Sequence, residues 1–159
     1  MKIKIITVGK VKEKYLIDGI KEYVKRLQAY TKLEFIEVQD ESIPESCTQI
    51  EQEKIKNKES KKVLQRIKTD EYVIVLDVKG ESIDSIGLSK HLEKCMLGGK
   101  STITFVIGGS IGHGVDILQR ANYRLSFSKM TFPHQLMKLI LMEQIYRVFK
   151  IIKNERYHK

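Results

Sequence analysis

The chain has 159 residues, of which 42% are hydrophobic and 31% are charged. This length and composition are typical of one globular domain with a sizeable core, and they exclude a disordered or fibrous chain. The formal net charge of +9 favours a polyanionic partner, for which RNA, DNA and an anionic membrane all qualify, over an inert basic surface.

The spacing of apolar residues predicts strands and helices that alternate along the whole chain. β-branched or continuous apolar runs indicate the strands, and apolar positions at helical spacing indicate the helices. The predicted elements, in chain order, are strand Ile3–Val8, helix Lys12–Tyr30, strand Leu33–Val38, a helix from Thr48 to about Lys68, strand Tyr72–Val78, a turn at Gly80–Asp84, helix Ser85–Leu97, strand Thr102–Ile107, a short helix within Gly114–Arg120, strand Tyr123–Phe127 and helix Leu136–Ile152.

Local signals place several boundaries of these elements. Thr48 and Glu51 form a capping box, Gly98-Gly99 ends a helix, and Pro133 suits the first turn of the last helix. The alternation predicts an α/β fold, with a mainly parallel sheet and helices on both faces. No linker or change of composition divides the chain, so we expect residues 1–159 to form a single domain.

Several classes of protein are not expected. Cys47 and Cys95 are far apart and outside any C-x-x-C pattern, so we expect neither a disulfide framework nor a zinc site. Met1 leads directly into a strand-like segment, and no run of about eighteen apolar residues occurs, so neither a secretory signal nor a membrane span is expected. We therefore expect a cytoplasmic protein that contacts no membrane.

A glycine cluster follows the fourth predicted strand. Gly108, Gly109, Gly112 and Gly114 would let the backbone approach a ligand closely. The pattern G-G-x-x-G-x-G is neither the dinucleotide fingerprint nor a P-loop, which disfavours NAD and nucleoside triphosphates. A glycine-rich turn without any ligand is the alternative that the sequence leaves open.

Ligands of parallel α/β sheets bind beyond the carboxyl ends of the strands. Three such ends are predicted to converge: Leu76-Asp77, residues 107–109 and residues 127–132. Together they offer backbone polar groups and several apolar side chains, but no phosphate cradle. This combination suits a flat, mostly apolar ligand such as adenine with a thioether arm.

Four motifs resemble those of a known family: IGGSIGHG at 107–114, LSFSKMTFPHQL at 125–136, LMEQIYRV at 141–148 and the terminal YHK. They are similar to SPOUT-class ribosomal RNA methyltransferases, and most of all to the small single-domain RlmH type, which methylates N3 of a pseudouridine in 23S rRNA. The resemblance covers the whole chain, because the length, the strand order and the N-terminal KIKIITVGK also fit.

The resemblance implies an α/β fold with a C-terminal trefoil knot, an exception to the rule that chains do not thread loops. It also implies a homodimer formed through the last helix. Twelve of the seventeen residues from Leu136 to Ile152 are apolar, which suits a helix buried by its own domain and by a partner.

By the same resemblance the methyl donor is S-adenosylmethionine, with no metal. The residues implied to bind it are Leu76, Gly108, Phe127, Ser128, Lys129, Met130, Thr131 and Phe132. The residue types agree, since backbone groups can hold the edges of adenine while apolar side chains cover its faces. Because the sulfonium is a cation, we expect Lys129 to point out of the pocket.

Methyl transfer to a uracil-type N3 needs a base that removes the imino proton, and histidine suits this task near neutral pH. We expect His91 to be inert, His113 to fill space or cap a turn, and His134 to have a structural role at least as readily as a chemical one.

In the family, the tail of one protomer reaches the cofactor site of the other. This makes Tyr157 and His158 the predicted acceptor-site residues, with Tyr157 stacking on a base and His158 accepting the proton. The family commonly has a proline before this Tyr-His pair, where Arg156 stands here, a departure that bears on the path of the tail. A disordered tail without function is the alternative.

Two basic regions could contact RNA phosphates without reading sequence. Residues 54–68 hold seven Lys or Arg and one acidic residue, Glu59, but a solvated helix face explains them equally well. The predicted RNA-binding residues lie nearer to the expected site and are Arg147, Lys150, Lys153, Arg156 and Lys159.

The sequence therefore predicts an S-adenosylmethionine-dependent methyltransferase that acts on N3 of a pseudouridine in 23S rRNA, on assembled ribosomes. Two alternatives stay open: a non-catalytic RNA-binding factor of the ribosome, and a knotted methyltransferase that acts on tRNA.

Overall fold

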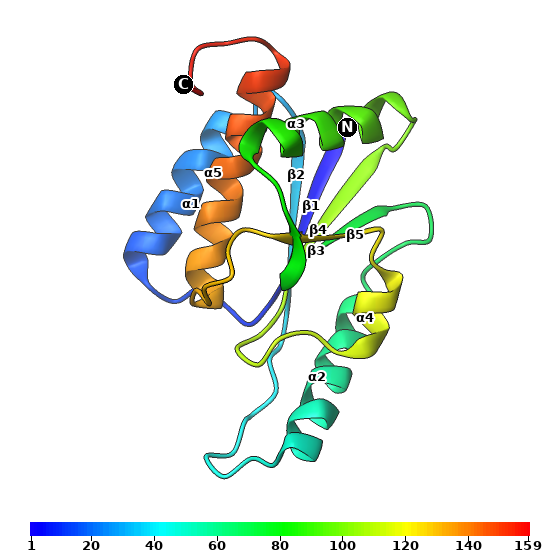
Figure 1. Cartoon of the computed structure of the whole chain (residues 1–159). Coiled ribbons are helices and arrows are strands. Elements are labelled where there is room, and N and C mark those ends of the chain that lie inside the picture. The colour runs from blue at the N-terminus through cyan, green and yellow to red at the C-terminus, as the bar shows by residue number, and fades with distance from the viewer.

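A computed structural model describes residues 1–159, with five strands in one sheet of order β2-β1-β4-β3-β5 (Figure 1). The strands are β1 (Lys2–Val8), β2 (Lys32–Val38), β3 (Tyr72–Ser82), β4 (Thr102–Ile107) and β5 (Tyr123–Ser126). Every neighbouring pair is parallel. The predicted α/β class, with its parallel sheet and its alternating order of elements, is therefore confirmed.

Helices cover both faces of the sheet, as predicted (Figure 1). The helices are α1 (Lys14–Leu27), α2 (Gln49–Leu64), α3 (Ser85–Leu97), α4 (Val115–Arg120) and α5 (His134–Ile152). α5 packs between α1 and α3 on one face, while α2 packs against α4 on the other. The sheet thus separates two cores.

The central strand β4 shows how the sequence supplies both cores. Ile103 and Phe105 are fully buried on the side of α1, α3 and α5. Val106 is fully buried on the side of α2 and α4, and Thr104 is buried as well. Each large apolar side chain buried in this way contributes about 1.5–3 kcal/mol. A strand covered on both faces must be apolar almost throughout, which is why β4 reads as a continuous run.

Helix ends follow local chemistry. Thr48 Oγ1 accepts a hydrogen bond from the Glu51 N–H at 3.2 Å, and the Glu51 carboxylate accepts one from the Thr48 N–H at 3.3 Å, so the capping box is confirmed. α1 and α2 are shorter than predicted: α1 ends at Leu27 rather than Tyr30, and α2 ends at Leu64 rather than about Lys68. α5 begins two residues earlier than predicted, directly after Pro133.

The turn predicted at Gly80–Asp84 is wrong in its first part. β3 continues to Ser82 and pairs with β5 a second time, after a register shift between Leu76 and Glu81. A Cβ atom at Gly80 would lie 2.6 Å from the Arg124 carbonyl oxygen. The glycine is therefore needed for close approach of a neighbouring strand, a requirement that a sequence pattern cannot distinguish from a turn.

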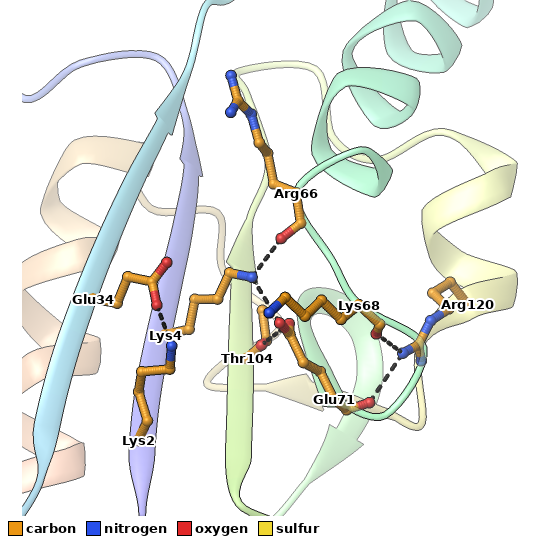
Figure 2. Close-up of polar contacts among 8 residues, drawn as sticks. All are labelled: Lys2, Lys4, Glu34, Arg66, Lys68, Glu71, Thr104 and Arg120. Atoms are coloured by element: carbon orange, nitrogen blue, oxygen red, sulfur yellow. Dashed lines mark hydrogen bonds and ion pairs between the residues drawn. The ribbon is translucent and has the colours of Figure 1, made fainter.

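A buried polar cluster lies at the amino ends of the strands (Figure 2). The Lys4 Nζ contacts Glu71 Oε1 at 2.8 Å and also donates to the Arg66 carbonyl, while Thr104 Oγ1 donates to Glu71 Oε2 at 2.6 Å. Arg120 donates to the carbonyls of Lys68 and Glu71 at 3.0 and 2.9 Å. The cluster therefore ties the segment between α2 and β3 to β1, β4 and α4.

The charge state of Glu71 follows from these contacts. Burial opposes ionisation of the carboxyl, but the hydrogen bonds from Lys4 and Thr104 and the Lys4 charge together lower the pKa of Glu71. Glu71 is therefore a carboxylate with a hydrogen bond to each oxygen, and a buried charge is tolerated when it is paired and hydrogen-bonded in this way.

None of the helices combines the length and the hydropathy that crossing a bilayer requires.

Replacing Glu71 with Ala should lower the free energy of unfolding by about 3–5 kcal/mol, because it leaves the Lys4 ammonium buried without its partner. Urea denaturation at neutral pH measures the change. The exposed pair between Lys2 and Glu34, drawn beside the buried one in Figure 2, is the matched control, and Glu34→Ala should cost far less because water screens that pair. Equal losses for Glu71→Ala and Glu34→Ala would contradict this assignment.

Candidate functional site

A cavity of about 280 Å³ lies beyond the carboxyl ends of β4 and β5 and beside the irregular middle of β3. Residues 76–78 follow the first part of β3, residues 107–113 form the glycine loop after β4, and residues 127–132 follow β5. Leu125 and Met137 complete the wall. Segments far apart in sequence thus meet at one edge of the sheet, as parallel strands require.

The chemistry of this lining is selective. Nine of its seventeen residues are hydrophobic, and the rest are mostly glycines and small polar residues. Asp77 is its single carboxylate, and no lysine or arginine belongs to it. The cavity therefore suits a ligand with apolar faces, with edges that bond to backbone groups, and with a positive charge rather than a phosphate.

His113 holds the glycine loop against β3. Its Nε2 lies 2.7 Å from the Leu76 carbonyl oxygen, and a Cβ atom at Gly108 would lie 2.8 Å from the ring. Burial lowers the pKa of His113 below its usual value, so the ring is neutral at pH 7 and its Nε2–H donates to Leu76. The prediction that His113 fills space understated its role, because the ring joins two of the three segments that wall the cavity.

Helix α2 supports the same loop from the other face of the sheet. Ser60 Oγ accepts a hydrogen bond from the Gly114 N–H at 2.8 Å, and Asn57 Oδ1 accepts one from the Val115 N–H at 3.3 Å. A Cβ atom at Gly114 would lie 2.7 Å from each of these two oxygens, so only glycine fits there. Sequence reasoning missed both supports, because neither Asn57 nor Ser60 belongs to a motif.

The third wall is a tight turn after β5. Ser126 Oγ lies 3.1 Å from the Val78 carbonyl and 3.0 Å from that of Ser128, and Ser128 Oγ accepts a hydrogen bond from the Met130 N–H at 2.9 Å. Met130 is 72% exposed and Phe132 36% exposed, although both line the cavity. Large apolar side chains at an open rim are typical of a surface that a ligand or a partner covers.

Most of the predicted cofactor-binding residues meet at this cavity. The residues that line it are Leu76, Gly108, Phe127, Ser128, Met130, Thr131 and Phe132. Lys129 is exposed and does not belong to the lining, in line with the expectation that it points away. His134 lies beside Gly9 and Asp40, outside the cavity, and His91 bonds to the Tyr72 hydroxyl at 3.0 Å.

The predicted acceptor residues Tyr157 and His158 lie elsewhere in the same chain. Met137, in the first turn of α5, lines the cavity, but the tail follows the opposite end of this helix. The tail starts about 20 Å from Met137 along the helix axis and then turns back, so that Tyr157 contacts Glu143 and His158 contacts Arg147, about 9 and 15 Å from Met137 along the axis. Figure 1 shows the C-terminus beyond the end of the sheet that is remote from the segment after β5. A single chain therefore does not bring Tyr157 and His158 to its own cavity.

The tail is nevertheless ordered by contacts with α5. Asn154, in the left-handed conformation, ends the helix and turns the chain back. The Tyr157 hydroxyl donates to Glu143 at 3.1 Å, and the Arg147 guanidinium lies 4.7 Å from the Tyr157 ring centre. Burial, with the nearby Tyr23 and Glu143, raises the pKa of Tyr157, so the phenol stays protonated. The tail is thus held on its own helix.

Arg147 connects this group of side chains. It contacts Glu143 at 2.6 Å, and its Nη1 lies 3.3 Å from His158 Nδ1. Because arginine can only donate, His158 Nδ1 accepts in this arrangement, and a neutral ring then carries its proton on Nε2. The clustering of Glu143, Arg147, Tyr157 and His158 was not predicted, although EQIYR and YHK were each recognised as motifs.

The five predicted RNA-binding residues fall into two kinds. Arg147 pairs with Glu143, and Lys150 pairs with Glu155 and lies over the rings of Tyr30 and Tyr146. Lys153, Arg156 and Lys159 are exposed and form no ion pair. Lys54, Lys58 and Lys61 are exposed along one side of α2.

The sequence was compared with known proteins. It matches the family described as "Predicted SPOUT methyltransferase" over residues 1–158. It is 53% identical to the "Ribosomal RNA large subunit methyltransferase H" of Enterococcus faecalis and 54% identical to that of Ruminiclostridium cellulolyticum, in each case over 100% of both chains. It is also 53% identical, with the same coverage, to the "Ribosomal RNA large subunit methyltransferase H 1" of Clostridium perfringens strain SM101.

The buried neutral His113 makes stability depend on pH. The unfolded chain titrates this histidine near pH 6.5, whereas the folded chain resists protonation. Acidification from about pH 7 to about pH 5.5 should therefore protonate the unfolded state first and lower the free energy of unfolding. In His113→Gln, whose amide can still donate to Leu76, that decline should be smaller, as measured by urea denaturation.

His91 is the control for this measurement, because burial lowers its pKa as well and its ring lies outside the cavity. His91→Gln should remove the part of the acid-induced loss of stability that comes from His91. The part that comes from His113 should remain. A His113→Gln chain with the full wild-type pH dependence would show that His113 is not held neutral.

Proposed function

The chain belongs to the SPOUT methyltransferase family, and from that premise we propose that it transfers a methyl group from S-adenosylmethionine to N3 of a pseudouridine in the 23S rRNA of the large ribosomal subunit. The names of its relatives refer to the RNA of this subunit, which supports the substrate class. The net charge of +9 suits a polyanionic substrate.

The observation that carries the donor assignment is the lining of the cavity. S-adenosylmethionine would supply a methyl group on a cationic sulfonium, and the lining has one carboxylate and no lysine or arginine. Backbone groups of Leu76 and of Gly108 are available for the edges of adenine, and Phe127, Met130 and Phe132 for apolar contact. Binding in this orientation would fix the sulfonium relative to the acceptor, and holding two reactants in the reactive geometry removes a large part of the barrier to such a transfer.

We propose that the acceptor residues come from a second copy of the chain. Tyr157 and His158 belong to the tail after the C-terminal end of α5, and neither lines the cavity of its own chain, so a homodimer with roughly antiparallel α5 helices would bring each tail to the other cavity. The composition of α5 supports this arrangement. Its apolar residues continue around the helix, and Leu136, Met137, Leu139 and Ile140 are only partly covered by their own chain.

In this dimer the chain's own side chains would manage the imino proton. His158 is proposed to accept it as N3 becomes nucleophilic, with Tyr157 stacked on the base. In the isolated chain Arg147 donates a hydrogen bond to Nδ1 of His158. This hydrogen bond must break, or the imidazole ring must rotate, before His158 can accept the imino proton. Arg156 and Lys159, both exposed, are proposed to meet phosphates or the anionic base together with Lys153.

We also infer that residues 1–159 act as one domain, because a single sheet separates two cores to which all the helices contribute. The trefoil knot implied by the resemblance stays a prediction. A domain of this size has no separate RNA-binding module, so we propose that it recognises a preassembled surface of the subunit or of the 70S ribosome.

Methyl transfer from isotopically labelled S-adenosylmethionine tests the reaction and the substrate together. Ribosomes from cells that lack this protein should accept label, and nucleoside mass spectrometry should find it in N3-methylpseudouridine. Free large subunits and stripped 23S rRNA, assayed in parallel, identify the assembly stage. Label in tRNA would contradict the rRNA assignment, and absence of label from every pool would contradict the proposed activity.

The tail proposal has its own test. His158→Ala should lower kcat by about two to four orders of magnitude and leave S-adenosylmethionine affinity, measured by calorimetry, unchanged. Mixed dimers of His158→Ala with a cavity variant such as Gly108→Arg should regain activity, since one of their two sites then combines an intact cavity with an intact tail. Lys90→Ala, at an exposed lysine on α3 outside both the cavity and the tail, is the control. Mixed dimers as inactive as their parents would contradict a site shared between chains.

A further inference from the structure

Helix α2 contacts the glycine loop at both of its ends. Ser60 and Asn57 bond to the backbone of Gly114 and Val115, where the loop enters α4. Glu59, the residue before Ser60, lies against the start of the loop, since a Cβ atom at Gly109 would lie 3.1 Å from Glu59 Oε1. Three neighbouring residues of one helix therefore determine where this loop can lie.

Glu59 has an unusual environment for a carboxyl group. It is 3% exposed, and its Oε2 accepts a hydrogen bond from the Glu41 N–H at 2.9 Å. Its Oε1 has no hydrogen-bond partner and is the only buried side-chain nitrogen or oxygen of the chain in this condition. An oxygen buried without a partner is rare in folded proteins and calls for an explanation.

The charges around Glu59 favour its neutral form. Burial raises the pKa of Glu59, and the carboxylates of Asp40 and Glu41 raise it further, while the Glu41 N–H and the Lys62 charge oppose them in part. Lys62 itself is paired with Glu41. A neutral carboxyl costs less to bury than a carboxylate and can lie against an uncharged loop.

We propose that Glu59 is a positioning residue for methyl transfer: packed against Gly109 and bonded to the backbone at Glu41, its carboxyl holds the glycine loop in the shape that receives the methyl donor. The inference rests on the proposed function and deepens it. Glu59 lies outside the cavity lining and acts through Gly109, which belongs to it.

A purely structural role does not explain the choice of residue. An apolar side chain of similar size would fill the same space beside Gly109 without an unpartnered oxygen. The carboxyl instead links two segments, the chain after β2 and the loop after β4, that border the carboxyl edge of the sheet. Holding the loop before the donor arrives lowers the cost of ordering it on binding.

Calorimetry with S-adenosylmethionine tests the proposal without RNA. Glu59→Ala should weaken binding about tenfold or more, because the loop loses its support. Glu59→Gln keeps the shape and an acceptor for the Glu41 N–H and carries no charge, so it should bind within about threefold of wild type. Val63→Ala is the matched control: Val63 is buried one turn further along α2 and should lower the melting temperature without changing affinity.

Two results of this calorimetry would overturn the proposal. The first is wild-type affinity in Glu59→Ala. The second is equal weakening in Glu59→Gln and Glu59→Ala, because it would show that a negative charge is required. A wild-type chain that binds no S-adenosylmethionine would contradict the proposed function itself, whereas normal binding by both the wild type and Glu59→Ala would contradict the role of Glu59 alone.

A double-mutant cycle tests the contact itself. Gly109→Ala places a methyl group against the Glu59 oxygens and should weaken donor binding in the wild-type background. In Glu59→Ala the side chain that opposes this methyl group is gone, so the second change should cost markedly less. Strictly additive effects of the two substitutions would show that Glu59 does not act through Gly109.

Discussion

The parallel pairing of β3 with β4 and of β3 with β5 is the constraint on which the site depends. Parallel strands leave the sheet at the same edge, so three segments that are separate in sequence meet around one cavity. The same constraint sends α5 back along the sheet and delivers the tail to the opposite edge. A single chain thus builds the cavity but does not bring its own tail to it, and this is why we propose that a second copy completes the site.

The two edges of the sheet are built on different principles. At the amino edge, Lys4, Glu71 and Thr104 are buried and satisfy one another, and Arg120 closes the adjoining loop. At the carboxyl edge the backbone is glycine-rich, Gly112 has a positive φ, and Glu59 keeps an oxygen without a partner. The fully bonded polar cluster thus lies at the edge where no ligand is expected, whereas the one unpartnered oxygen lies behind the glycine loop that lines the cavity.

Much of this architecture could be predicted from the sequence, because buried parallel strands and capped helices have strong local signals. Residues Ser85–Leu97 and Thr102–Ile107 have the predicted boundaries, and the residues chosen after β3, β4 and β5 line one cavity, apart from Lys129. Contacts between distant segments could not be predicted in the same way. From the local sequence alone, Gly80 looks like a turn residue and Glu59 like one acidic residue among lysines. Their roles are visible only in the fold, where Gly80 lies against β5 and Glu59 against the glycine loop. The hydrogen bond from His113 to Leu76 is equally nonlocal.

The order of the tail within one chain bears on the proposed site shared between two chains. Tyr157, Arg147 and Glu143 already hold the last residues on α5, and Glu155 bonds to Tyr30 at 2.6 Å, so the direction of the tail is set before any partner arrives. A free tail would lose its conformational entropy on docking, whereas a tail fixed on a rigid helix has lost most of it on folding. In the proposed dimer, aligning two helices would then bring the tail to the other cavity in a defined orientation. The cost of ordering the proposed acceptor residues would thereby fall on folding rather than on each catalytic cycle.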